Sequence, residues 1–275
     1  MIGLKRARTA AGVPAAFSGA QLVKKNAKLL KAFYATNGAI KFDAALTLWK
    51  AAKEHLKKES NSKCAYCEAD TAVVAHGDVE HFRPKSKYWW LAYCYDNYTY
   101  ACQICNQSFK GDEFPLGAGA LVKPQLPAAE PADLNPLAKK LCLDPLASTD
   151  VAVAAYYATE SAFIVNPYIE DPEKLLEWSV DDVNKEVLLK AGPTQRAQEA
   201  FASAVEFLGL NREELKRVRY PTYEAFRTFR DVLLEPSVSQ PVKDMVRTQM
   251  KTMVAGNLPF TGMLRYFVKE WGLVL

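Results

Sequence analysis

The chain has 275 residues, a formal net charge of +4, 49% hydrophobic residues and 24% charged residues. This length and composition are ordinary for a globular protein with one large domain or two small ones. The sequence contains no apolar run that could span a bilayer and no apolar secretory core at its start. We therefore expect a cytoplasmic protein without membrane contact, in which cysteines do not form a disulfide framework.

The first segment, residues 1–60, is expected to be basic and helical. Between Met1 and Phe42 it carries eight Lys or Arg residues and no acidic residue. Apolar residues at helical spacing predict an amphipathic helix over residues 21–34 and a second helix capped by Asp43. The charge has two interpretations that the sequence leaves open. It is either a solvated helix face or a contact to phosphates or an acidic partner.

The second segment, residues 61–116, contains two Cys-x-x-Cys pairs. The cysteines are Cys64, Cys67, Cys102 and Cys105. Each pair can occupy two corners of a tetrahedron, and a closed set of four thiolates is typical of structural zinc. We therefore predict one structural Zn²⁺ held by these four side chains.

Between the cysteine pairs, the sequence VEHFRPK places Glu80 directly before His81. The other two histidines are not expected to act in catalysis. His55 should be solvated on a helix, and His76 should lie in a loop. The carboxylate of Glu80 and the amide oxygen of Asn106 are hard ligands that suit Mg²⁺ or Mn²⁺. His81 beside such an ion could take a proton from water, which predicts metal-assisted phosphodiester hydrolysis. The cations expected to contact phosphate are Arg83, Lys85 and Lys110.

The stretch VEHFRPK…DNYTYACQICNQSFKG resembles the HNH endonucleases of the His-Me finger (ββα-metal) class. The resemblance implies that His81 is the general base, that Glu80 and Asn106 bind the catalytic ion, and that Asn97 supports the loop orienting His81. The chain departs from the family pattern at Asn106, where the last letter of the name expects histidine. This departure leaves the preferred ion open.

Further short sequence motifs, from KCAYCE to FLGLNREEL, resemble those of the HNH nucleases of bacterial retron and Septu anti-phage systems. The resemblance covers residues 63–219, and such proteins typically work beside a partner ATPase. It implies a mainly α, formally α+β, fold with a small zinc-stapled ββα-metal element. A hairpin should bring Glu80, His81 and Asn97 together, and a helix should begin near Asn106. Because neighbouring strand residues face opposite ways, Glu80 and His81 must lie where a strand ends or twists.

The remaining chain is expected to form a connection and a mainly helical C-terminal region. Residues 117–157 are rich in Pro and Ala and predict a long loop. Residues 158–275 are expected to be mainly helical, and the part from about Thr194 onward is expected either to dock a partner or only to cover the core. Strand-like pieces within them cover residues 163–169, 175–180 and 185–189.

Helical periodicity resumes at Thr194 and continues toward the C-terminus. Gly209 is expected to stop the first helix, and Asn211 to cap the next. Pro221 should kink or break that second helix.

Two functions fit these patterns. The first is a metal-dependent endonuclease acting on nucleic acid, with DNA favoured over RNA, as the effector of a defence system. The alternative is a non-catalytic, zinc-stabilised nucleic-acid-binding or assembly subunit, which would not need Glu80, His81 and Asn106 together. The chain has no Gly-rich phosphate loop of its own, so ATP dependence would require another chain.

Overall fold

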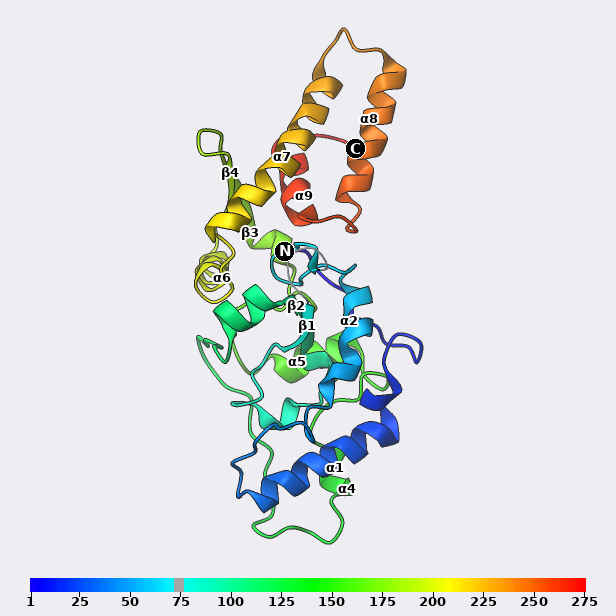
Figure 1. Ribbon diagram of the computed structural model, residues 1–275, viewed down its shortest axis with the longest axis vertical. Coiled ribbons are helices and arrows are strands. Elements are labelled where there is room, and N and C mark those ends of the chain that lie inside the picture. The colour runs from blue at the N-terminus through cyan, green and yellow to red at the C-terminus, as the bar shows by residue number, and fades with distance from the viewer. Residues whose placement is uncertain (72–76) are drawn as a thin grey trace. The chain divides into compact units, whose positions relative to one another are not determined.

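The computed structural model describes residues 1–71 and 77–275 (Figure 1). His76, expected in a loop, lies outside the described residues. The chain divides into two compact units that are not consecutive segments. One comprises Met1–Leu4, Asn61–Ala75 and Phe163–Leu275, and the other comprises Lys5–Ser60 and His76–Ala162. Each described unit contains helices and a two-stranded antiparallel sheet, so the fold is mixed α and β.

The unit with Lys5–Ser60 carries the predicted site residues of the VEHFRPK motif. Its elements in chain order are η1 (Ala15–Phe17), α1 (Gly19–Ala35), η2 (Trp49–Ala52), α2 (Lys53–Glu59), β1 (Gly77–His81), η3 (Trp89–Leu91), η4 (Tyr95–Asn97), β2 (Tyr98–Cys102), the π-helix η5 (Ile104–Lys110), α4 (Asn135–Ala138) and α5 (Asp150–Tyr157).

A hairpin and a following helix form the centre of this unit. Strands β1 and β2 pair antiparallel, with His81 opposite Tyr98. The aromatic residues of β2 pack with Val79 and residues of α2 in a buried core. A Cβ atom at Gly77 would lie 2.2 Å from the ring of Tyr100, so this close approach requires glycine. Helix η5 follows β2 directly and starts two residues before Asn106, as the sequence predicts.

The other unit contains a second hairpin and four longer helices. Helix α7 packs on β4 and α8, and Figure 1 shows α7 and α8 as two neighbouring helices joined by a short loop. Thr194 caps α6 by accepting a hydrogen bond from the Ala197 N–H at 3.2 Å. The elements are η6 (Pro172–Lys174), β3 (Leu176–Asp181), β4 (Glu186–Ala191), α6 (Gln195–Glu206), α7 (Glu213–Leu234), α8 (Gln240–Val254) and α9 (Thr261–Glu270).

Two expectations about this unit are wrong. Residues 163–169 form a turn rather than a strand, because the Asn166 side chain accepts a hydrogen bond from the Tyr168 N–H at 3.0 Å. Asn211 does not cap α7. Its amide instead bonds both the N–H (2.8 Å) and the carbonyl (3.0 Å) of Leu189 in β4. The predicted strands at residues 175–180 and 185–189 are present as β3 and β4.

Three further boundaries differ from those predicted. Asp43 organises a turn by accepting hydrogen bonds from two backbone N–H groups, and α2 begins only at Lys53. The stretch 117–157 is not all loop, because α4 and α5 lie within it. Of the kink or break expected at Pro221, the break does not occur, because α7 continues to Leu234. In the part of the chain that the structure describes, no helix is both long enough and apolar enough to cross a membrane.

Candidate functional site

The end of β1 opens into a small pocket of about 260 Å³. Glu80 and His81, the last two residues of the strand, both line it together with Asn106 of η5. The strand ends at His81, as expected if the two neighbouring side chains are to share one site. The pocket is completed by Trp49, Val79, Pro84, Lys85, Gln107, Gly111 and Asp112.

His81 is buried and held in one tautomer. Its Nε2 lies 3.1 Å from the carbonyl oxygen of Ala92. A carbonyl only accepts hydrogen bonds, so Nε2 carries the hydrogen and Nδ1 is the acceptor. The ring edges of Trp49 and Tyr98 fix the plane of the imidazole. Burial, followed by the charge of Lys85, lowers the pKa of His81 from 6.5 to about 3. The ring is therefore neutral at physiological pH.

Glu80 forms a buried ion pair with Lys110. The Lys110 Nζ lies 2.6 Å from Oε1 of Glu80 and donates to the carbonyl of His81 at 3.2 Å. Burial raises the pKa of Glu80, and the charge of Lys110 opposes that rise. Lys110 is fully buried and its charge balances that of Glu80, so this arrangement gives no support to the expected phosphate contact.

Asn97 is buried beneath the loop that follows His81. Its Oδ1 accepts from the N–H of Arg83 at 2.9 Å, and its Nδ2 donates to the Arg83 carbonyl at 3.0 Å. Its own carbonyl accepts from the N–H of Phe82 at 2.8 Å. Because the backbone N–H and carbonyl of Arg83 are both hydrogen-bonded to Asn97, the backbone directly after His81 has little conformational freedom.

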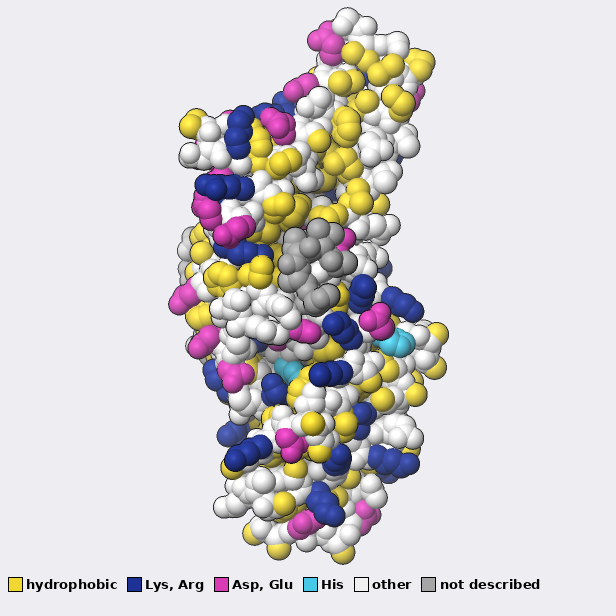
Figure 2. All heavy atoms as spheres, viewed as in Figure 1, with side chains coloured by type: hydrophobic (Ala, Val, Ile, Leu, Met, Phe, Trp, Pro, Cys, Tyr) yellow, Lys and Arg dark blue, Asp and Glu magenta, His cyan; other side chains and the backbone are white. Residues whose placement is uncertain are grey.

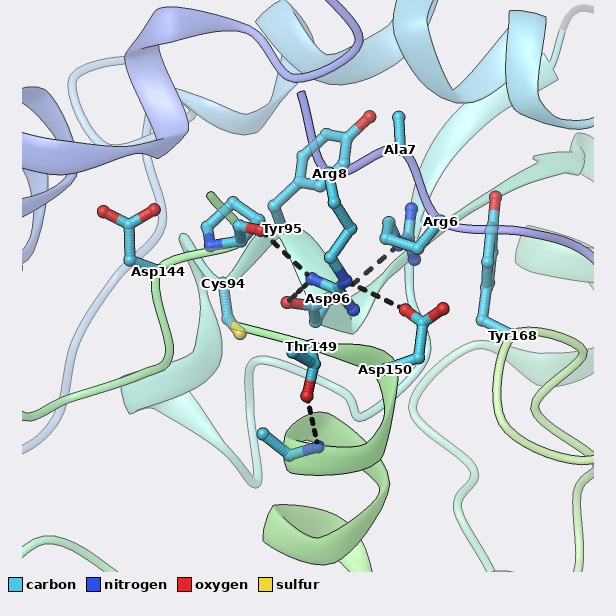
Figure 3. A network of polar contacts seen from close by, with 12 residues as sticks. Arg6, Ala7, Arg8, Cys94, Tyr95, Asp96, Asp144, Thr149, Asp150 and Tyr168 are labelled. Carbon is cyan, nitrogen blue, oxygen red and sulfur yellow. Dashed lines mark hydrogen bonds and ion pairs between the residues drawn. The ribbon is translucent and has the colours of Figure 1, made fainter. Parts of the chain in front are cut away.

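Two arginines of the N-terminal segment hold the turn that contains Asn97. Arg8 lies between Asp96 (2.8 Å) and Asp150 (2.9 Å), as Figure 3 shows. Arg6 donates to the carbonyl of Tyr98 at 2.6 Å. Two of the N-terminal positive charges, those of Arg6 and Arg8, therefore stabilise the fold. Figure 2 shows further Lys and Arg side chains spread over the face that carries α1 and α2.

Arg83, also expected to contact phosphate, does not line the small pocket. It is buried, forms an ion pair with Glu160 and lies 3.6 Å from the ring centre of Tyr157. The same Glu160 accepts from the Tyr88 hydroxyl at 2.9 Å. Sequence reasoning missed Glu160, because no local signal links two residues that lie 77 positions apart.

Lys85 is the expected cation that stays accessible. It is half-buried, lines the pocket and lies 5.3 Å from the ring centre of Trp49. This contact holds the aliphatic stem while leaving the charged end beside the pocket. Of the three cations predicted to contact phosphate, Lys85 is the one positioned to do so.

The oxygen atoms lining the pocket suit a hard divalent cation. Glu80 supplies a carboxylate and Asn106 an amide oxygen, and the exposed Asp112 adds a second carboxylate. Sequence reasoning missed Asp112, although it follows Lys110 by two residues. The oxygen donors fit Mg²⁺ or Mn²⁺. The positive charges of Lys85 and Lys110 lie nearby and oppose cation binding.

Four buried cysteines form a separate cluster. The sulfur atoms of Cys64, Cys67, Cys102 and Cys105 all lie within 4.8 Å of one another. Zn–S bonds of about 2.3 Å place tetrahedral sulfur atoms about 3.8 Å apart. The four residues are therefore positioned to bind a metal ion, in agreement with the predicted structural zinc.

Similarity to known proteins is limited to part of the chain. The chain is 38% identical over 80 residues to the Septu protein PtuB of Bacillus mycoides (strain KBAB4). The similarity covers 24% of this chain and 27% of that protein, so it spans about a quarter of the relative's length. No family model matches the sequence, and no solved structure matches it.

Replacing Asn97 by alanine should destabilise the unit by about 2–5 kcal/mol. The change leaves the buried N–H and carbonyl of Arg83 without partners, at about 1–3 kcal/mol each. Asn106→Ala is the matched control, because Asn106 is half-exposed and should change stability by about 1 kcal/mol or less. Urea unfolding of the two variants measures the difference. Equal midpoints would contradict the structural role of Asn97.

Proposed function

We propose that this protein is a metal-dependent HNH-type endonuclease that hydrolyses phosphodiester bonds of nucleic acid, with DNA as the favoured substrate. The observation that carries the proposal is the pocket at the end of β1, which Glu80, His81 and Asn106 line together. The state of His81 supports it further. With Nε2 bound to the carbonyl of Ala92, Nδ1 remains the acceptor that a general base needs.

In this proposal each side chain of the pocket has a separate role in hydrolysis. His81 Nδ1 takes a proton from the attacking water, while the Ala92 carbonyl keeps the ring in position. Lys85 meets the negative charge of the scissile phosphate. Asn97 holds the loop between these two groups. Glu80 and Asn106 would hold Mg²⁺ or Mn²⁺, which would stabilise charge on the phosphate and the leaving oxygen.

A non-catalytic nucleic-acid-binding or assembly subunit is the competing function. It requires the cysteine cluster and the basic surface, but it gives no reason to hold a neutral histidine and hard oxygen ligands in one pocket. Incubating the zinc-loaded chain with DNA and RNA panels in Mg²⁺ or Mn²⁺ separates the two functions. The panels should be repeated with the products of neighbouring genes, because a defence nuclease can stay inactive without its partner.

We further propose a role in anti-phage defence with a partner ATPase. The resemblance to retron and Septu nucleases and the partial similarity to a Septu protein support this role. Exposed apolar side chains on the unit with α7 and α8 offer a docking surface. Leu234 at the end of α7 and Met245 on α8 are 62% and 66% exposed. Apolar side chains exposed on two packed helices are a surface that a protein partner can cover.

Changing Leu234 and Met245 together to glutamate should abolish co-purification with the proposed partner ATPase. Two charges placed in an apolar interface each lose hydration without gaining a partner. Val183→Glu is the matched control, since Val183 is 90% exposed in the turn between β3 and β4 of the same unit. A complex that survives the double substitution would place docking elsewhere.

A further inference from the structure

A second cavity, of about 640 Å³, is lined by the same loop that borders the small pocket. This loop, residues 83–89, contributes Lys85 to the small pocket and Lys87 and Trp89 to the second cavity. Two residues span at most about 7 Å. A polymer chain that enters one cavity therefore passes close to the other.

The lining of this cavity combines aromatic rings and cations. Phe33 and Trp89 stack with ring centres 4.5 Å apart, and Tyr34 lies beside them on α1. All three rings are partly exposed, and Lys87 and Lys123 are exposed. No acidic residue is among the described residues that line the cavity. Aromatic faces beside unneutralised cations are the chemistry by which proteins bind unpaired nucleotides.

The cavity is held in shape by buried contacts. Glu160 fixes the 83–89 loop at both ends, through Arg83 and the Tyr88 hydroxyl. It also accepts from the N–H of Leu121 at 3.3 Å, two residues before Lys123. One buried carboxylate thus holds both segments that carry the lysines. An exposed contact adds to these, in which the Tyr34 hydroxyl donates to the carbonyl of Pro127 at 3.1 Å.

We propose that this cavity binds an unpaired nucleotide of the substrate strand next to the scissile phosphate. The base lies against Trp89 and Phe33, and Lys87 and Lys123 contact the phosphates. A paired base cannot reach a protein ring without leaving its stack, so the cavity selects single-stranded or locally melted nucleic acid. The inference rests on the proposed nuclease function, because that function makes the nucleic-acid strand the substrate.

The test is binding of a fluorescein-labelled 12-nucleotide strand to the full, zinc-loaded chain carrying His81→Ala, without added Mg²⁺ or Mn²⁺. Single-stranded DNA, single-stranded RNA and duplex DNA are the three arms. Trp89→Ala should weaken single-strand binding by about 5- to 150-fold, and Trp89→Phe should restore most of it. Lys87→Gln and Lys123→Gln should each lower the slope of log K against log salt by about 0.7. Lys140→Gln, at another exposed lysine of the same unit, should not change it.

The lysine variants keep the test decisive if Trp89→Ala fails to fold, since both lysines are exposed. Unchanged salt slopes in the two lysine variants would overturn the inference, as would equal affinity for duplex and single strands. Failure of the proposed function looks different. A parent chain that binds single strands through this cavity but cleaves them neither alone nor with the products of neighbouring genes would refute the nuclease proposal alone.

Discussion

Cleavage by a His81→Ala variant should be about 10²- to 10⁴-fold slower than cleavage by the parent chain in single-turnover reactions, the usual contribution of a general base. The imidazole is neutral and its Nδ1 can accept a proton, while alanine offers no acceptor. Substrate affinity should change little, because His81 is buried at the end of β1 and Lys85 supplies the accessible charge.

His55→Ala is the matched control for this loss. His55 lies on α2, and its Nδ1 is 2.8 Å from the carbonyl oxygen of Gly12. The sequence predicts a solvated side chain, but the structure shows a half-buried ring in contact with the backbone. It does not line the pocket. The variant should therefore cleave at the parent rate. If His81→Ala also cleaves at that rate while remaining folded, His81 is not the base.

Loss of the cysteine cluster should have the largest effect on stability. Cys102→Ser removes one of four buried sulfur ligands, and a structural zinc site contributes folding free energy directly. Zinc measured by elemental analysis should fall from about one ion per chain toward zero. The melting temperature should drop by about 10 °C or more, which is the scale expected when several kcal/mol are lost.

Cys142→Ser provides the comparison. Cys142 is also buried, but it lies outside the cluster. Any destabilisation there comes from placing a hydroxyl in a buried site, and the zinc content should stay at about one ion per chain. A well-folded parent chain that contains no zinc would contradict the assignment.

The short motifs predicted local structure well, because their information is local. The family resemblance of the VEHFRPK motif and of the sequence between the cysteine pairs implied a hairpin followed by a helix, and β1, β2 and η5 occupy those positions. The cysteine spacing predicted a metal cluster, and the four sulfur atoms lie together. In both cases the signal is a short motif, and only within each motif do residues close in the chain define the geometry.

The errors concern partners that are distant in the chain or belong to the backbone. Arg83 and Lys110 were expected to meet phosphate because they lie close in sequence to Glu80, His81 and Asn106. Each is buried by a specific carboxylate, Glu160 in one case and Glu80 in the other. The tautomer of His81 depends on the carbonyl of Ala92, and every residue has a carbonyl. No residue type could have signalled that contact.

Boundary errors have a similar cause. Asn211 has the residue type of a helix cap, but its amide pairs with the backbone of Leu189 in β4 instead. An asparagine side chain fits either position, so the choice depends on which backbone groups tertiary packing brings near it. The largely apolar segment 163–169 likewise predicts a strand. In the structure, the Asn166 side chain accepts a hydrogen bond from the Tyr168 N–H and stabilises a turn there.

The central claim is that the pocket formed by Glu80, His81 and Asn106 hydrolyses nucleic acid with the help of a divalent ion. Its most direct test is single-turnover cleavage of labelled DNA and RNA by the zinc-loaded chain with its partner, across a titration of Mn²⁺ and Mg²⁺. The parent should cleave in an ion-dependent manner, and Glu80→Gln should shift the titration to higher ion concentrations, because an amide binds a divalent cation more weakly than a carboxylate. Intact nucleic acid at every ion concentration, or a titration that Glu80→Gln leaves unchanged, would contradict the account.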